Sequence, residues 1–194
     1  MNKTILDIIS ENPRTGRSAS QAFVFKELYR RFDYQSINIV ETGCIRNPKD
    51  GCDGWGTLLW RKWADLSNSF VYSVDNNSRH LFNCKQVVTY SPRVFYIYND
   101  SVEFLNTLPA SFKIQLLFLD SYDYTKEDQK PCAEHQLKEL KAAEKNLVNN
   151  SLILIDDIFD INDFTGKGQL SIPYLLNKGW KIISYLDTQI LLSK

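Results

Sequence analysis

The feature that most constrains the fold is a regular alternation of short apolar runs and longer amphipathic stretches. Five runs of six or seven residues are rich in β-branched and aromatic side chains: residues 37–42, 70–75, 94–100, 114–120 and 151–157. Short runs that are apolar throughout are typical of strands buried on both faces of a parallel sheet. Because helix-like stretches separate them, the pattern predicts an α/β fold with right-handed crossovers.

The helical pattern is clearest after the fourth run. From Ala133 to Leu147 the apolar positions recur every three or four residues, with charged residues on the opposite side. We expect Asn149 and Asn150 to end this helix. The last two apolar runs, 180–186 and 188–194, lie too close together for a helical crossover. They therefore predict an antiparallel hairpin at the end of the chain.

The length and charge of the chain limit its architecture and partners. A chain of 194 residues fits one domain, with residues 1–36 as a helical cover and 37–194 as an α/β core. The 23 basic and 23 acidic residues balance, which gives no electrostatic footprint for nucleic acid or an anionic membrane. Since no apolar run approaches the ~20 residues of a membrane span, we expect a cytoplasmic protein. Four scattered cysteines without a C-x-x-C pair indicate reduced thiols and no zinc site.

A glycine-rich loop follows the first predicted strand. Glu41, Thr42 and Gly43 stand at the strand tip, and three further glycines and Trp55 follow before the next helix. Glycines let a backbone turn sharply and wrap closely around a ligand. The loop matches neither G-x-G-x-x-G nor the P-loop pattern, so by itself it is equally compatible with a flexible surface loop.

Polar side chains also follow the second and third predicted strands. The second ends at Asp75 and Asn76, and the third is followed by Asp100 and Ser101. Ligands of open α/β sheets bind beyond the carboxyl ends of the strands, where an acidic side chain can accept hydrogen bonds from both hydroxyls of a ribose. Asp100 or Ser101 could instead only cap the next helix. Taken together, the three tips favour a ligand that contains a nucleoside.

The fourth and fifth predicted strands end in carboxylates. Asp120 follows the fourth, and Asp156 and Asp157 follow the fifth. Neighbouring strands lie ~4.8 Å apart, so equivalent tips would bring the three carboxylates together. Carboxylates at such close range repel one another unless a positive charge lies among them. Mg²⁺, or Mn²⁺ in its place, would supply that charge. The alternative is that these residues cap helices or are solvated.

Successive motifs of the chain resemble those of class I methyltransferases that use S-adenosylmethionine. The motifs are "VETGCIRNP", "DGWGT", "YSVDNN", "NDSVEFL", "LLFLDSYDY" and "LILIDDIFD". The acidic tips are similar to those of the metal-dependent O-methyltransferases, and "GKG" is more similar to the branch that modifies sugars, which includes glycan-methylating domains of large viruses. The resemblance implies a Rossmann-like fold with a mostly parallel seven-stranded sheet and helices on both faces. The chain would then methylate a hydroxyl of a small molecule or glycan, in a host cytoplasm if a virus encodes it, and homodimerisation is possible.

The resemblance also implies roles for individual residues. Glu41, Thr42 and Gly43 are expected at the methionine part of the cofactor, with Trp55 in the substrate cleft and Asp120 beside them. Asp75 and Asn76 are expected at the ribose. Asp100, Ser101 and Tyr122 are expected at the adenine. Asp120, Asp156 and Asp157 would be the metal ligands.

The sequence does not identify the residue that accepts the proton. A catalytic lysine of the catechol-type enzymes has its equivalent place at Asp123, so we consider Asp120, Asp123, His135 and Lys167 as catalytic candidates. His135 could equally be a surface residue, and Lys167 could bind the acceptor.

The sequence is also compatible with other functions. A catechol or phenol acceptor and a non-catalytic cofactor-binding subunit are both compatible with the motifs. An NAD-dependent enzyme is disfavoured, because Asp75 follows Gly43 by 32 positions (75 minus 43) rather than the ~20 of the dinucleotide fingerprint.

Overall fold

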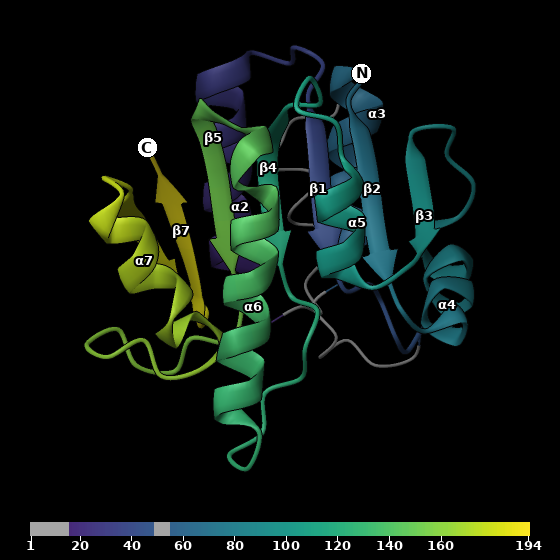
Figure 1. Cartoon of the computed structure of the whole chain (residues 1–194). Coiled ribbons are helices and arrows are strands. Elements are labelled where there is room, and N and C mark those ends of the chain that lie inside the picture. Colours follow the sequence, from purple (N-terminus) through teal and green to yellow (C-terminus); the bar gives the residue numbers. More distant parts are fainter. Residues whose placement is uncertain (1–15, 49–54) are drawn as a thin grey trace.

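The structure, a computed structural model, describes residues 16–48 and 55–194. Helices and strands alternate over most of the chain (Figure 1). Their order, with η2 and η3 as 3-10 helices, is α2 (Ser18–Phe32), β1 (Asn38–Thr42), α3 (Gly56–Ser67), β2 (Phe70–Asp75), α4 (Ser78–Val88), β3 (Val94–Tyr98), α5 (Ser101–Thr107), β4 (Ile114–Leu119), α6 (Gln129–Ala143), η2 (Glu144–Asn146), β5 (Leu147–Ile155), η3 (Lys167–Gln169), α7 (Ser171–Asn177), β6 (Lys181–Leu186) and β7 (Gln189–Ser193).

The strands form one seven-stranded sheet in the order β3-β2-β1-β4-β5-β7-β6. The first five strands are parallel, whereas β7 is antiparallel to both β5 and β6. The sequence-based prediction of a mostly parallel sheet with a C-terminal hairpin is therefore confirmed. The arrowheads of β1 to β5 all reach the same edge of the sheet (Figure 1), so the polar tips predicted from the sequence share that edge.

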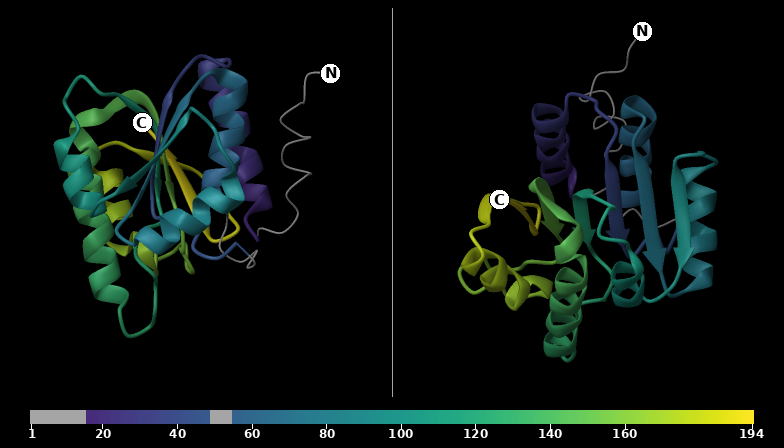
Figure 2. Two further views of the ribbon diagram at one scale, coloured as in Figure 1. Left: turned by 90° about the vertical axis from the view of Figure 1, so that its right-hand side faces the viewer. Right: turned by 45° about the horizontal axis from the view of Figure 1, so that its top comes forward.

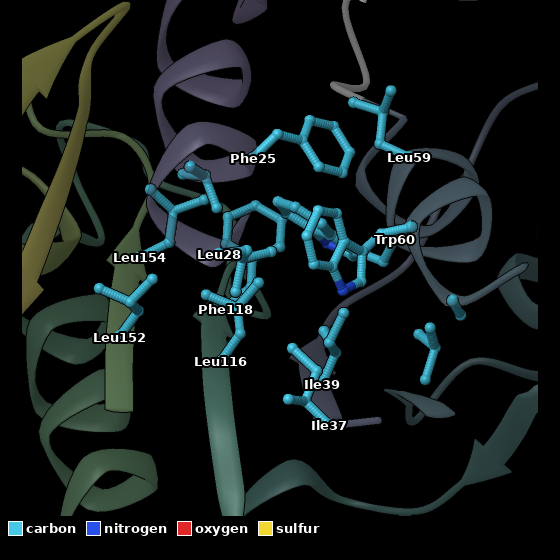
Figure 3. Close-up of a cluster of buried hydrophobic side chains, with 14 of the residues drawn as sticks. Phe25, Leu28, Ile37, Ile39, Leu59, Trp60, Leu116, Phe118, Leu152 and Leu154 are labelled. Carbon is cyan, nitrogen blue, oxygen red and sulfur yellow. The ribbon is translucent and has the colours of Figure 1, made fainter. Parts of the chain in front are cut away.

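Helices cover both faces of the sheet (Figure 2). Because side chains alternate along a strand, neighbouring residues of one strand enter different cores. On β4, Leu116 and Phe118 pack with α2, α3 and α4, while Leu117 and Leu119 pack with α5, α6 and α7. Figure 3 shows the first core, where Phe25 and Leu28 of α2 and Trp60 of α3 lie over the sheet.

Helix α2 is the described part of the predicted N-terminal cover. Its apolar stripe at Val24, Phe25, Leu28 and Phe32 is buried against the sheet. The helix ends at Asp33, which adopts a left-handed conformation. Burial of four large side chains contributes about 1.5–3 kcal/mol each before entropy is counted, so α2 is an integral part of the core.

The end of α6 differs from the sequence-based prediction. The helix stops at Ala143, and β5 already begins at Leu147, so Asn149 and Asn150 belong to the strand. Both asparagines are exposed, and the β4–β5 register shifts between Ile114 and Leu116. An exposed, irregular strand start has polar side chains, which is why it was mistaken for a helix end.

Two further expectations concern cysteines and membranes. Cys44, Cys84 and Cys132 are free thiols, as expected, and Cys52 lies outside the described residues. Within residues 16–48 and 55–194, no helix combines the length and the apolar character that a membrane span requires.

Candidate functional site

The tips of β1 and β4 touch through Gly43. Its φ of 83° is in the left-handed region, and its N–H donates to the carbonyl of Val74 at 2.8 Å. A Cβ at this position would lie 2.4 Å from the carbonyl oxygen of Asp120. Only glycine permits this close approach, so the expected turn after the first strand is confirmed as a feature that joins two strand tips.

Glu41 is buried beneath this turn. Its carboxylate accepts hydrogen bonds from the hydroxyls of Thr57 at 2.5 Å and Ser73 at 2.8 Å. A Cβ on Gly56 would lie 2.5 Å from Glu41 Oε1, so the start of α3 packs directly on the carboxyl group. Burial raises the pKa of Glu41 well above its ordinary value, although the two hydroxyls lower it. The resulting group is fixed in position by neutral donors.

A pocket, here called the first pocket, crosses the strand tips from β2 to β5. It is lined by Asp75 and Asn76 at one end, by Gly43 in the middle and by Asp120 and Asp157 at the other end. The Asp75 carboxylate accepts from the backbone N–H of Asn77 at 2.8 Å. His80 lies close to it, with Nδ1 3.3 Å from Oδ1. Asp75 is thus held firmly at the place where the sequence predicts a ribose ligand.

A second pocket adjoins the first, and Gly43, Asp75, Asn76 and Ser121 line both. Its far end is formed by residues from three elements or loops: Asp100, Ser101, Tyr122 and His135. Asp100 caps α5 by accepting the N–H of Glu103 at 3.0 Å, so capping and lining of the pocket are both present.

His135 lies in this second pocket. Its Nε2 is 3.1 Å from Ser101 Oγ and 3.4 Å from a carboxylate oxygen of buried Glu139, and its ring centroid is 5.6 Å from that of Tyr122. Glu139 raises the pKa of His135, while burial lowers it less. The structure therefore places His135 with the expected adenine-binding residues, and its contacts are with Ser101, Glu139 and Tyr122.

The three carboxylates expected to bind metal converge, together with two cations. We call Asp120, Asp156, Asp157, Lys167 and Arg17 the acidic cluster. Lys167 Nζ lies 2.5 Å from Asp120 Oδ1 and 3.0 Å from Asp157 Oδ2. Arg17 Nη2 lies 2.8 Å from Asp156 Oδ1 and 3.0 Å from Asp157 Oδ1. The sequence predicts a divalent ion among these carboxylates; in the structure the positive charges among them are the side chains of Lys167 and Arg17.

Local geometry brings Lys167 to this place. Gly166 has a φ of 122°, and a Cβ there would lie 1.8 Å from the carbonyl oxygen of Asp157. The N–H of Lys167 donates to the same carbonyl at 3.2 Å. Burial lowers the pKa of Lys167, but the carboxylates of Asp120 and Asp157 raise it above its ordinary value. The "GKG" motif thus delivers a charged ammonium to the carboxylates.

The acidic cluster has the donor atoms of a divalent-ion site but not an open position for the ion. Three carboxylates supply the hard oxygen ligands that Mg²⁺ prefers. As they stand, however, no group of three acidic, histidine or cysteine side chains among the described residues is arranged around an open metal position. Lys167 and Arg17 occupy the space between the oxygens. The chemistry of the donors fits the ion, and the present arrangement holds two cations in its place.

The remaining candidates lie nearby in different roles. Thr42 is fully buried and accepts the N–H of Asp120 at 3.0 Å through its carbonyl, so it joins strand tips. Trp55 packs against the core beneath α2 and α3 and lines neither pocket. Asp123 lines the first pocket and forms an ion pair with Arg46. Residues 49–54 of the glycine-rich loop lie outside the described residues.

Two pocket residues, Arg17 and Arg46, were not predicted as part of the site. Both are ordinary arginines in loop-like sequence, and only the folded chain shows which carboxylates they meet. Arg17 lies 140 positions from Asp157 in the sequence. A basic residue next to the glycine of "TGRS" was the only available signal.

The sequence matches no protein-family model and shows no significant similarity to a curated protein. Its structure is similar to that of the O-methyltransferase NovP, with a TM-score of 0.65, 12% identity and coverage of 92% of this chain and 79% of NovP. MycE methyltransferase of the mycinamycin pathway, in complex with Mg and S-adenosylhomocysteine (SAH), gives a TM-score of 0.58 at 16% identity, with coverage of 89% of this chain and 48% of MycE.

An rRNA methylase from Streptococcus thermophilus is also similar, with a TM-score of 0.55, 14% identity and coverage of 89% of this chain and 95% of that protein. The chain spans about half the length of MycE. Similarity at these identities reports a shared fold, and the acceptors named for these proteins differ. The chain therefore has the fold of the class I S-adenosylmethionine-dependent methyltransferases.

Proposed function

We propose that the chain is an S-adenosylmethionine-dependent O-methyltransferase that uses a divalent metal ion, Mg²⁺ or Mn²⁺, to methylate a hydroxyl of a sugar or glycan. The observation that carries the proposal is the pair of adjoining pockets. They share Gly43, Asp75, Asn76 and Ser121, and their combined lining extends from Ser101 and His135 to Asp120 and Asp157. Such an arrangement supports a nucleoside site that adjoins an acidic site.

Different residues would contact the adenine, the ribose and the methionine part of the cofactor. Tyr122 and Ser101 would border the adenine in the second pocket, and Asp75 would accept hydrogen bonds from the ribose. Glu41 and Gly43 line the first pocket between Asp75 and the acidic cluster, where the methionine part would lie. The cofactor supplies an electrophilic methyl group. These residues orient it toward the carboxylates, and orientation of this kind can supply several kcal/mol of the rate acceleration.

Asp120, Asp156 and Asp157 would hold the metal ion, which when bound acidifies an acceptor hydroxyl. The proton must then reach a base. In the metal-free cluster the carboxylates of Asp120 and Asp157 raise the pKa of Lys167, so the ammonium keeps its proton there. His135 lies in the cofactor part of the cleft. Asp123 lines the first pocket, its side chain is 69% exposed, and Arg46 orients it. We propose Asp123 as the group that accepts the proton and passes it to solvent.

Two features support a sugar or glycan acceptor rather than a nucleic acid. The 23 basic and 23 acidic residues balance, so the composition has no excess of basic residues for a phosphate backbone. Tyr124 and Phe159 follow the tips of β4 and β5, and their ring centroids are 4.8 Å apart. Aromatic rings beside an acidic site suit the apolar face of a sugar. MycE, whose structure is similar, has also been observed in complex with mycinamycin VI. That ligand is known for MycE only.

A methyl-transfer assay tests the proposal. The chain is incubated with tritiated S-adenosylmethionine and a panel of glycosides and catechols, with Mg²⁺ or with EDTA. We expect transfer to glycosides that EDTA and Asp156→Asn both abolish. Binding of SAH without transfer to any hydroxyl would instead indicate a non-catalytic subunit, and transfer confined to catechols would move the acceptor to the phenol class.

A further inference from the structure

Without any metal, two cations already balance two of the three carboxylates of the acidic cluster. Three carboxylates face two cations, and the side chains of Lys167 and Asp156 are only 3% and 6% exposed. Charges buried to this extent are stable only when they are paired. The cluster therefore has resident counter-ions in place before a divalent ion arrives.

Lys167 and a divalent ion compete for the same oxygens. The ammonium lies between Asp120 at the β4 tip and Asp157 at the β5 tip, at 2.5 Å and 3.0 Å. A divalent ion bound by these carboxylates would have oxygens at ~2.1 Å. Its two charges would then stand at contact distance from the ammonium, with little water between them to screen the repulsion. We therefore expect the ammonium and the ion to exclude each other from this position.

Arg17 differs from Lys167 in the carboxylates that it joins. Arg17 contacts Asp156 and Asp157, which are neighbours on one tip. Of these two cations, Lys167 is the one that joins the β4 tip to the β5 tip, as a metal ion bound by all three carboxylates would. Lys167 is therefore the residue whose charge stands in the position of the ion.

We infer that Lys167 is a resident counter-ion which a divalent metal must displace, so that this lysine sets the metal affinity of the site. The inference rests on the metal site of the proposed function and adds a residue that opposes binding. Divalent binding becomes an exchange, in which the Lys167 ammonium leaves Asp120 and Asp157 as the ion enters. Displacement also frees the ammonium to contact solvent or an acceptor hydroxyl.

The test measures Mn²⁺ binding by electron paramagnetic resonance of free Mn²⁺, with the full chain and without cofactor or acceptor. Lys167→Met removes the charge and keeps an unbranched side chain of similar length. We expect Lys167→Met to bind Mn²⁺ at least about tenfold more tightly than the unmodified chain, because one opposing charge is gone. Asp156→Asn in the Lys167→Met background should abolish that binding.

Lys178→Met is the matched control. Lys178 forms an ion pair with Glu144, and both side chains are substantially exposed, in contrast to those of the acidic cluster. Its replacement removes the same charge from the protein and should leave Mn²⁺ affinity unchanged. Equal affinity of the unmodified chain and Lys167→Met, or weaker binding by Lys167→Met, overturns the inference. If Lys178→Met also bound Mn²⁺ more tightly, the effect would come from the net charge of the protein, and this too would overturn the inference.

A second measurement applies if Lys167→Met does not fold. Acetylation of the unmodified chain by an amine-specific reagent, followed by mass spectrometry, reports the exposure of each lysine. Saturating Mn²⁺ should increase acetylation of Lys167 several-fold, with Lys178 unchanged, and unchanged protection of Lys167 contradicts the exchange. Neither measurement uses methyl transfer. A chain that binds Mn²⁺ equally well with and without Lys167 but still methylates glycosides would refute the exchange and keep the proposed function.

Discussion

The two ends of the cleft stabilise their carboxylates in different ways. At the cofactor end, Glu41 is held by the hydroxyls of Thr57 and Ser73, which lie on neighbouring elements of the first half of the chain. At the acidic end, Asp156 and Asp157 depend on charged partners instead: Arg17, 140 positions from Asp157 in the sequence, and Lys167 at the start of η3, after β5. Neutral donors form a site that is fixed once the sheet has folded. Charged partners form a site that another cation can enter.

The largest expected effect separates catalysis from cofactor binding. Asp156→Asn should reduce methyl transfer by about 10³-fold, or ~4 kcal/mol, because it removes a carboxylate on which the metal site depends. SAH affinity, measured by calorimetry, should change by less than about threefold, because Asp156 lines the acidic end. Loss of SAH binding in this variant would show that the two ends are not independent.

The second prediction concerns the backbone that delivers Lys167. Gly166→Ala should lower the free energy of unfolding by about 3 kcal/mol, because its Cβ would meet the Asp157 carbonyl at 1.8 Å. Gly179→Ala is the control: its φ of 84° is also positive, but a Cβ there meets nothing within 4 Å. Strain alone should cost about 1 kcal/mol at Gly179. Urea denaturation measures the free energy of unfolding of both variants. Equal decreases would contradict the close approach of Gly166 to the Asp157 carbonyl.

The third prediction addresses the cofactor end. Asp75→Ala should weaken SAH binding by tenfold to a hundredfold, or about 2 kcal/mol, because the ribose loses a charged acceptor. Mn²⁺ affinity of the same variant should remain within about twofold, since the Asp75 carboxylate contacts Cys44, Asn77 and His80, which lie outside the acidic cluster. Parallel calorimetry with SAH and with Mn²⁺ checks this. A joint loss of both affinities would contradict the division of the cleft.

The smallest effect is a dependence of stability on pH at the second pocket. Glu139 raises the pKa of His135 above its ordinary value of 6.5, while burial lowers it less. The stability from this pair is therefore fully present below about pH 6.5 and is lost as the pH rises through the raised pKa. The difference in free energy of unfolding between the unmodified chain and His135→Asn should shrink by less than about 1 kcal/mol from pH 6 to pH 9. A difference that grows with pH in urea denaturation would contradict this sign.

The strand tips could be predicted from the sequence because short apolar runs end abruptly at polar residues. Asp75, Asp120 and Asp156 each follow such a run, and parallel pairing then places them on one edge. The start of β5 was missed, because Asn149 and Asn150 are exposed and carry no strand signal. A pattern of apolar residues predicts the buried part of a strand and not its solvated end.

The partners of the carboxylates could not be predicted in the same way. Electrostatics requires positive charge near Asp156 and Asp157, but either a metal ion or a side chain can supply it. Arg17 reaches the site only because α2 packs on the sheet and places its first residues beside the β5 tip. Tertiary packing decides such a contact, and no local pattern records it.

The central claim is that the tips of β4 and β5 form a cation site beside a cofactor cleft. Diffraction from crystals soaked with Mn²⁺ and SAH tests it most directly. We predict an anomalous peak for Mn²⁺ between the carboxylates of Asp120, Asp156 and Asp157. Lys167 should be turned away from them, and the nucleoside of SAH should lie beside Asp75. An ordered SAH molecule with no anomalous peak, and with Lys167 still between Asp120 and Asp157, would contradict the account.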